Sequence, residues 1–184
     1  MVVKLIVAIG NPGKAYAFSR HNIGFLLADK LVEELRGSPF KPSSKNFSSI
    51  AKVETPSDCL VFIKPETFVN LSGKAVLSAK SFFNVDSEHL LVLADDVNHS
   101  FGKARLRYQA GSGGHKGIKS IVASLGSNNF WQLRLGIGRP LNDSSGLSDF
   151  VLGHFSAEEK EQLGVFFAEA STLFTQWCLE PRAA

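Results

Sequence analysis

The sequence predicts an α/β domain in which α-helices cover both faces of a mixed, mostly parallel β-sheet. Short apolar segments rich in β-branched residues alternate with longer segments whose apolar residues recur at helical spacing, as in a parallel sheet with crossover helices. A hairpin-like pair of strands and a segment with two-residue alternation indicate antiparallel members as well. A length of 184 residues is typical of a single domain, expected over residues 1–184.

The first strand is expected over residues 3–9, because this segment is almost wholly apolar and β-branched, like a strand buried on both faces. A loop follows, and a helix is expected from about Asn22. Gly37 and Pro39 end its pattern. The apolar positions that define its inner face are Ile23, Leu26, Leu27, Leu31 and Leu35.

Two strands of hairpin type come next, over residues 47–53 and 59–63. The turn-rich link 55–58 joins them, and Pro65 ends the second. Asn70 opens a further helix. Three more strands are expected over residues 90–94, 103–108 and 131–137.

The later helices are marked by their first residues. One follows a glycine-rich loop over 111–115 and continues through Leu125. The last begins at Ser156, which forms a capping box with Glu159. Two glycine-rich polar segments, 108–117 and 139–150, are expected to be mobile loops that become ordered on substrate binding.

Composition is that of an ordinary globular protein, with 44% hydrophobic and 20% charged residues. The net charge of +3 supports nucleic-acid contact only if the cations gather on one face. Cys59 and Cys178 belong to no Cys-x-x-Cys pair, so we expect neither a disulfide framework nor zinc, and a reducing cytoplasm is the expected location. No apolar stretch reaches the length of a membrane span, so no membrane association is expected.

Polar residues follow the buried strands, at the sheet edge where such folds bind ligands. His21 lies beyond the first strand and Asp95 follows the strand over 90–94. A carboxylate beside an imidazole fixes its tautomer and stabilises its protonated form, so the pair can serve as a general base. A histidine that caps or solvates the following helix is the alternative. No Gly-x-Ser-x-Gly elbow is present, so water activated by His21 is the simplest nucleophile.

Two asparagines could act beside this base. The amides of Asn11 and Asn70 can donate to a developing oxyanion or hold a substrate carbonyl. Structural roles are open too: Asn11 in an Asx turn before Pro12, and Asn70 as a helix cap. Phosphate-loop spacing fails at Ala8 and at Ala15, and no metal-ligand motif occurs, so neither a nucleotide nor a metal is expected.

Cations cluster around the strand over 103–108. We expect them to gather near the candidate site, where the free backbone N–H groups of the glycine loop also suit phosphate. The alternative is that these charges lie on an exposed edge strand and prevent it from pairing with another chain. The cations are Lys103, Arg105 and Arg107, with Lys116, Lys119 and Arg134.

Six motifs occur in order along the chain. They are Gly10-Asn11-Pro12-Gly13 with Tyr16 and Arg20-His21-Asn22, then Thr67-Phe68-Val69-Asn70-Leu71-Ser72-Gly73, then Asp95, then Gly113-Gly114-His115-x-Gly117, then Arg134-Leu135-Gly136-Ile137-Gly138, and Phe150-Val151-Leu152-Gly153. Together they resemble the bacterial peptidyl-tRNA hydrolase family. The resemblance implies an enzyme that cleaves the ester between a peptide's C-terminus and the tRNA 3′ hydroxyl, recycling tRNA, as a monomer with no metal or organic cofactor.

The resemblance also assigns roles to matching positions. It makes His21 the general base, Asp95 its orienting partner and Asn11 a polarising amide. Substrate-binding positions are Tyr16, Val69, Asn70, His115 and Lys116, and tRNA phosphates are expected at Lys103, Arg105, Arg107 and Arg134. Two residues depart from the family pattern: Val69 replaces the common methionine, and Lys116 replaces the usual asparagine. The ammonium of Lys116 removes an acceptor and adds a charge, which favours phosphate over peptide contact.

Three functions follow from these observations. The leading one is an RNA-linked ester hydrolase. A noncatalytic RNA-binding relative would keep the fold and the cations, and ester turnover separates it from the first. A general esterase acting on small substrates would bind no RNA, so binding that weakens with added salt would argue against it.

Overall fold

The structure is a computed structural model that describes residues 1–141 and 146–180. Seven strands form one sheet: β1 (Val2–Ala8), β2 (Lys41–Ser43), β3 (Ser48–Glu54), β4 (Asp58–Pro65), β5 (Leu90–Asp96), β6 (Ala104–Tyr108) and β7 (Trp131–Gly136). Their order is β2-β3-β4-β1-β5-β7-β6. The four central strands are mutually parallel, whereas β2, β3 and β6 pair antiparallel with their neighbours. The predicted mixed, mostly parallel sheet is confirmed.

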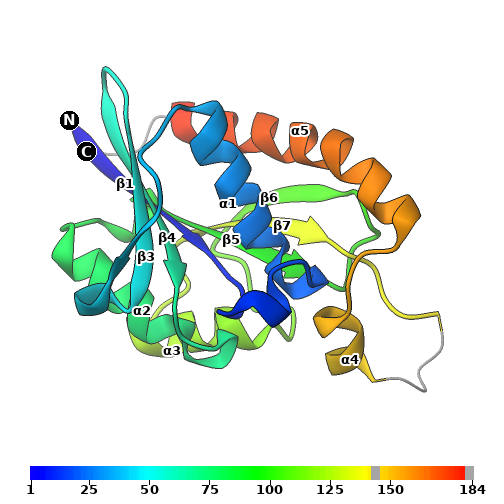
Figure 1. Cartoon of the computed structure of the whole chain (residues 1–184). Helices are drawn as coiled ribbons and strands as arrows, with labels where there is room; N and C mark the ends of the chain where they lie inside the picture. Colours follow the sequence, from blue (N-terminus) through cyan, green and yellow to red (C-terminus); the bar gives the residue numbers. More distant parts are fainter. Residues whose placement is uncertain (142–145, 181–184) are drawn as a thin grey trace.

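Helices cover both faces of this sheet, as predicted. The helices are α1 (Ile23–Glu34), α2 (Ser72–Phe82), α3 (Lys116–Leu125), α4 (Leu147–Leu152) and α5 (Ala157–Leu179). Short 3₁₀ helices connect them: η1 (Lys14–Tyr16), η2 (Arg20–Asn22), η3 (Ser44–Asn46), η4 (Val69–Leu71) and η5 (Ser87–His89). Helices α1 and α5 lie on one face, and α2 and α3 lie on the other (Figure 1). No helix in the described ranges is long and apolar enough to cross a membrane.

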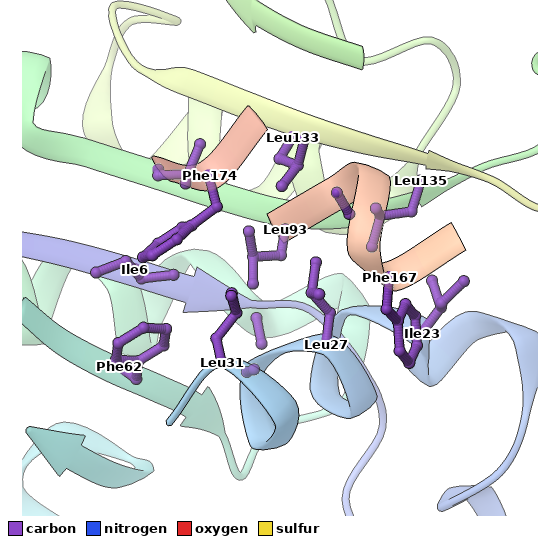
Figure 2. Close-up of a cluster of buried hydrophobic side chains, with 14 of the residues drawn as sticks. Ile6, Ile23, Leu27, Leu31, Phe62, Leu93, Leu133, Leu135, Phe167 and Phe174 are labelled. Atoms are coloured by element: carbon purple, nitrogen blue, oxygen red, sulfur yellow. The ribbon is translucent and has the colours of Figure 1, made fainter. Parts of the chain in front are cut away.

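Side chains of β1 alternate between two hydrophobic cores. Ile6 faces α1 and α5, while Leu5 and Val7 face α2 and α3. In the first core Ile6 lies with Leu27 and Phe174 (Figure 2). Each fully buried side chain of this size contributes about 1.5–3 kcal/mol. The continuous apolar run of β1 is therefore required on both of its faces.

Helix α1 begins unusually close to β5, and this approach places the site. A Cβ added to Gly24 would lie 2.6 Å from the carbonyl oxygen of Leu93. Glycine is the residue that permits such close backbone contact. The residues just before Gly24 are consequently held against the end of β5.

Three local features bear on the predictions. The hairpin of β3 and β4 is confirmed, and so is the capping box: the Ser156 hydroxyl accepts from Glu159 N, and the Glu159 carboxylate accepts from Ser156 N. Strand β2 and helix α4 were not predicted. Helix α4 falls partly within the expected loop 139–150, of which residues 142–145 lie outside the described part of the chain.

Candidate active site

A cavity of about 650 Å³ lies at the carboxyl ends of the central strands. Eight of the twelve predicted site residues line it: Asn11, His21, Val69, Asn70, Asp95, His115, Lys116 and Arg134. Asp95 lies near the end of β5, and His21 and Asn11 follow β1. Parallel strands bring their carboxyl ends to one edge of the sheet, which explains the convergence of residues far apart in sequence.

The floor of the cavity holds two histidines on one carboxylate oxygen. Asp95 Oδ1 lies 2.8 Å from His21 Nδ1 and 2.7 Å from His115 Nε2. Only 3% of the Asp95 side chain is exposed, against 14% for His21 and 6% for His115. The two imidazole rings lie 5.2 Å apart, centre to centre.

The contacts of His115 fix its tautomer. Its Nδ1 accepts from the backbone N–H groups of Gly117 at 3.0 Å and Ile118 at 3.4 Å, so it caps α3. A neutral ring that accepts at Nδ1 carries its proton on Nε2, which then donates to Asp95. Both ring nitrogens of His115 are therefore used within the protein. His115 was predicted to bind substrate, and the structure also gives it a hydrogen bond that orients the carboxylate of Asp95.

The carboxylate of Asp95 is kept ionised by its neighbours. Burial by itself would raise the pKa of Asp95, but the charges and hydrogen bonds of His115 and His21 lower it well below its ordinary value. An ionised Asp95 accepts from His21 Nδ1–H, which leaves His21 Nε2 as the acceptor. His21 lines the cavity, and no described residue bonds to its Nε2. This nitrogen is available to a ligand as a base.

Asn22 holds Asn11 beside the histidine pair. Its Nδ2 donates to Asn11 O at 2.9 Å, and its Oδ1 accepts from Asn11 N at 2.9 Å. The side chain of Asn11 is oriented as well, since its Oδ1 accepts from Val69 N at 3.0 Å. Asn11 Nδ2 has no acceptor among the described residues and remains a donor for a ligand. Asn11 therefore bonds across the site to Val69 rather than within a local turn.

Asn70 and Lys116 are both exposed at the cavity, on η4 and at the start of α3. Within the described ranges neither η4 nor α2 has a side-chain N-cap, which excludes the alternative that Asn70 caps a helix. Phe68, 56% exposed, lines the cavity beside Asn70. These groups can reach a ligand without breaking internal bonds.

The side chain of Arg134 is buried and bonded within the protein, unlike the exposed cations that usually bind phosphates. It is 6% exposed, and its guanidinium donates to Asp96 Oδ2 at 3.0 Å, Gln132 Oε1 at 3.0 Å and Ser112 O at 3.2 Å. Burial by itself would raise the pKa of Asp96, but the Asn98 N–H and Arg134 lower it below its ordinary value. Arg134 thus joins β7 to β5 and to the loop before His115, and its role as a phosphate ligand stays a prediction.

Four predicted residues lie outside this cavity. Tyr16 is half-buried on η1, and Lys103, Arg105 and Arg107 are exposed at or next to the edge strand β6. Arg105 pairs in register with Arg134, so the two share a face of the sheet. Arg105 is thus a neighbour of the cavity-lining Arg134 rather than part of the cavity wall.

Sequence reasoning missed two parts of the site. Helix α4 supplies an apolar wall through Leu147, Val151 and Leu152. Arg139 lines the cavity and donates to Asn98 Oδ1 at 2.6 Å. Leu147 and Val151 have helical spacing, but a six-residue helix is too short for that period to be distinctive.

His21, Asp95 and His115 are also the described residues whose donor atoms lie close enough to hold a metal ion, within 4.8 Å of one another. The tautomer of His115 argues against that use. Its Nε2 carries a proton because Nδ1 caps α3, and a metal ligand must offer a bare nitrogen. The hydrogen bonds of His21 and His115 to Asp95 explain why these three side chains lie together.

Comparison with known proteins identifies the family of this chain. The peptidyl-tRNA hydrolase family model matches residues 5–183. A peptidyl-tRNA hydrolase of Chlamydia pneumoniae is 67% identical over 96% of this chain and 98% of its own length, and one of Chlamydia caviae is 61% identical over 95% of each. A crystal structure of peptidyl-tRNA hydrolase from Acinetobacter baumannii superposes with a TM-score of 0.84 at 29% identity, covering 95% of this chain and 89% of the other. The chain therefore belongs to the peptidyl-tRNA hydrolase family.

Proposed function

We propose that this chain hydrolyses peptidyl-tRNA with a water molecule that His21 activates as a general base. The observation that carries the proposal is the 2.8 Å contact between His21 Nδ1 and the buried Asp95, at the floor of an open cavity. Family membership makes the ester of peptidyl-tRNA the substrate. His21, oriented by Asp95, supplies the base that ester hydrolysis requires.

The reaction balances with these groups alone. His21 Nε2 takes a proton from water as the water oxygen forms a bond to the ester carbonyl carbon. Asp95 stabilises the imidazolium that results. When the tetrahedral intermediate collapses, the bond to the tRNA 3′ oxygen breaks and His21 returns its proton to that oxygen. The products are a tRNA with a free 3′ hydroxyl and a peptide with a free carboxylic acid, which loses its proton to solvent and becomes a carboxylate.

Asn11 is the proposed oxyanion donor. Because its Oδ1 is held by Val69 N, its Nδ2 is oriented before substrate arrives. A preorganised donor of this kind contributes about 10²–10³-fold in kcat. Asn70, Val69 and Phe68 would contact the peptide beside the ester.

The tRNA is proposed to leave the cavity toward β6. Lys103, Arg105 and Arg107 are exposed there, and Lys116 is exposed at the cavity itself. Removing a single cation that binds phosphate should make the slope of log affinity against log salt shallower by about 0.7–0.9. Arg105→Gln and Arg107→Gln would test this part of the proposal through the salt dependence of KM.

Hydrolysis of an N-blocked aminoacyl-tRNA tests the mechanism. The wild-type protein, His21→Ala and an unblocked aminoacyl-tRNA control are compared. We expect release of tRNA from the blocked substrate only, with loss of turnover but retained RNA binding in His21→Ala. Tight binding by the wild-type protein without turnover would favour the noncatalytic relative, and hydrolysis of small esters without RNA binding would favour the general esterase.

We also propose that the chain acts as a monomer in the cytoplasm. The family resemblance in the sequence supports the monomer, and the free thiols of Cys59 and Cys178 support a reducing cytoplasm. Sedimentation of the purified protein at several concentrations tests the first part. Cell fractionation tests the second.

A further inference from the structure

Helix α4 forms a wall of the active-site cavity, and the hydrophobic core holds it only in part, because Phe150 and Val151 pack against that core while half-buried. None of its six residues, all within the described part of the chain, is buried. It lies apart from the four longer helices (Figure 1). Val151 and Leu152 nevertheless line the cavity. A polar contact adds to this packing in setting the position of the wall.

That contact comes from Arg20, the residue before His21. Its Nη1 donates to Phe150 O at 3.4 Å, and its guanidinium carbon lies 4.4 Å from the centre of the Phe150 ring. Its backbone N–H donates to Gly153 O at 2.9 Å. Ser19 and His154 form a short antiparallel bridge beside it. Backbone and side chain of Arg20 thus both hold the C-terminal end of α4.

Arg20 is itself anchored on α5. Its Nη2 donates to Glu159 Oε2 at 2.9 Å, and the two side chains are only 14% and 19% exposed. The same Glu159 oxygen accepts from Ser156 N at 2.7 Å in the capping box. A charge-assisted bond at such a partly buried position is stronger and more rigid than a surface ion pair. Glu159 therefore aims Arg20 while it caps the helix.

We propose that Arg20 is a positioning residue that fixes the α4 wall relative to His21 and thereby sets the affinity for peptidyl-tRNA. The inference rests on the proposed function only for its kinetic consequence. Substrate and transition state both contact the wall, so a displaced α4 weakens their binding equally. Such uniform binding is expressed in KM and leaves kcat unchanged.

The kinetic test compares Arg20→Met with Ser156→Ala. Methionine keeps the packing of the stem and removes the guanidinium, whereas Ser156→Ala breaks the other arm of the capping box and leaves Arg20 intact. For N-blocked aminoacyl-tRNA we expect KM to rise about tenfold in Arg20→Met, with kcat within about twofold and an unchanged pH profile. Ser156→Ala should leave KM unchanged. Equal KM increases in both variants, or a fall in kcat alone, would overturn the proposal.

Amide hydrogen exchange tests the docking without any activity. Exchange in residues 147–153 should accelerate in Arg20→Met and not in Ser156→Ala, while β5 stays protected in both. Unchanged exchange in Arg20→Met would overturn the proposal even if the enzyme were active. If Arg20→Met fails to fold, Arg20→Lys decides by the same criteria, because lysine can pair with Glu159 but cannot also reach Phe150 O as a fork.

Discussion

Asp95→Asn should be less damaging here than the loss of a carboxylate from an ordinary catalytic triad. In such triads the asparagine amide can present its NH₂ to the histidine and so select the wrong tautomer. This lowers kcat about 10⁴-fold. In this site His115 donates to the same oxygen as His21, and its tautomer is fixed by Gly117 and Ile118. An asparagine amide must therefore keep its oxygen toward both rings.

The fall in kcat that we still expect comes from the lost negative charge of Asp95, which no longer stabilises the His21 imidazolium. Two charges about 4 Å apart interact by about 4 kcal/mol at an effective dielectric of about 20, equivalent to about three decades in rate. Since 14% of the His21 side chain is exposed, solvent reduces this figure. We expect kcat to fall about 10²–10³-fold in Asp95→Asn.

Without His115, Asp95→Asn should lower kcat by as much as the same change does in an ordinary catalytic triad. In Asp95→Asn/His115→Ala the amide is free to flip, so kcat should fall about tenfold below the product of the two single effects. Single-turnover hydrolysis of an N-blocked aminoacyl-tRNA measures all four proteins. A loss in Asp95→Asn as large as in His21→Ala, or single effects that simply multiply, would refute the reasoning.

Three further outcomes are expected. Asn11→Asp keeps the acceptor for Val69 N but replaces the donor with a second buried carboxylate, so kcat should fall about 10²–10³-fold and the urea midpoint should fall as well. Gly73→Ala should destabilise by about 1–3 kcal/mol in urea unfolding, because its Cβ would lie 2.2 Å from a backbone oxygen of α3, whereas Gly164→Ala on α5 meets no atom within 4 Å and should not destabilise. The pKa of Asp96 is lowered in the folded state; its stabilisation should be complete above about pH 5 and lost as pH falls through that lowered pKa, and Asp96→Asn should show a smaller loss of urea stability on acidification.

Much of the fold could be predicted because apolar patterns report burial directly. The run over 90–94 and its two aspartates predicted both a buried strand and a polar end, which became β5. The convergence of His21 with Asp95 followed from the rule for parallel strands. The binding of His115 to the same oxygen could not be predicted in this way. It depends on a loop in which Gly113 and Gly114 have φ of 56° and 85°, and no sequence period encodes such a path.

Arg134 shows a different limit. The family resemblance makes Arg134 a phosphate ligand, as one of the cations expected to gather near the candidate site. Burial in β7 requires an internal partner first, and Asp96 supplies it at 3.0 Å. The pairing was inferable from adjacent strands only if their order was known, and β7 lies beside β5 through a long crossover.

The two consecutive aspartates of β5, Asp95 and Asp96, bind different partners in the site. Successive side chains of a strand point to opposite faces; Asp95 takes the two histidines, while Asp96 takes Arg134. Arg134 in turn holds the carbonyl of Ser112, and Ser112 O accepts from His115 N at 3.0 Å. His115 is thus fixed by one aspartate through its ring and by the other through its backbone. A change at either position should disturb the same histidine, which is why Asp96→Asn is expected to lower kcat as well as stability, by less than Asp95→Asn does.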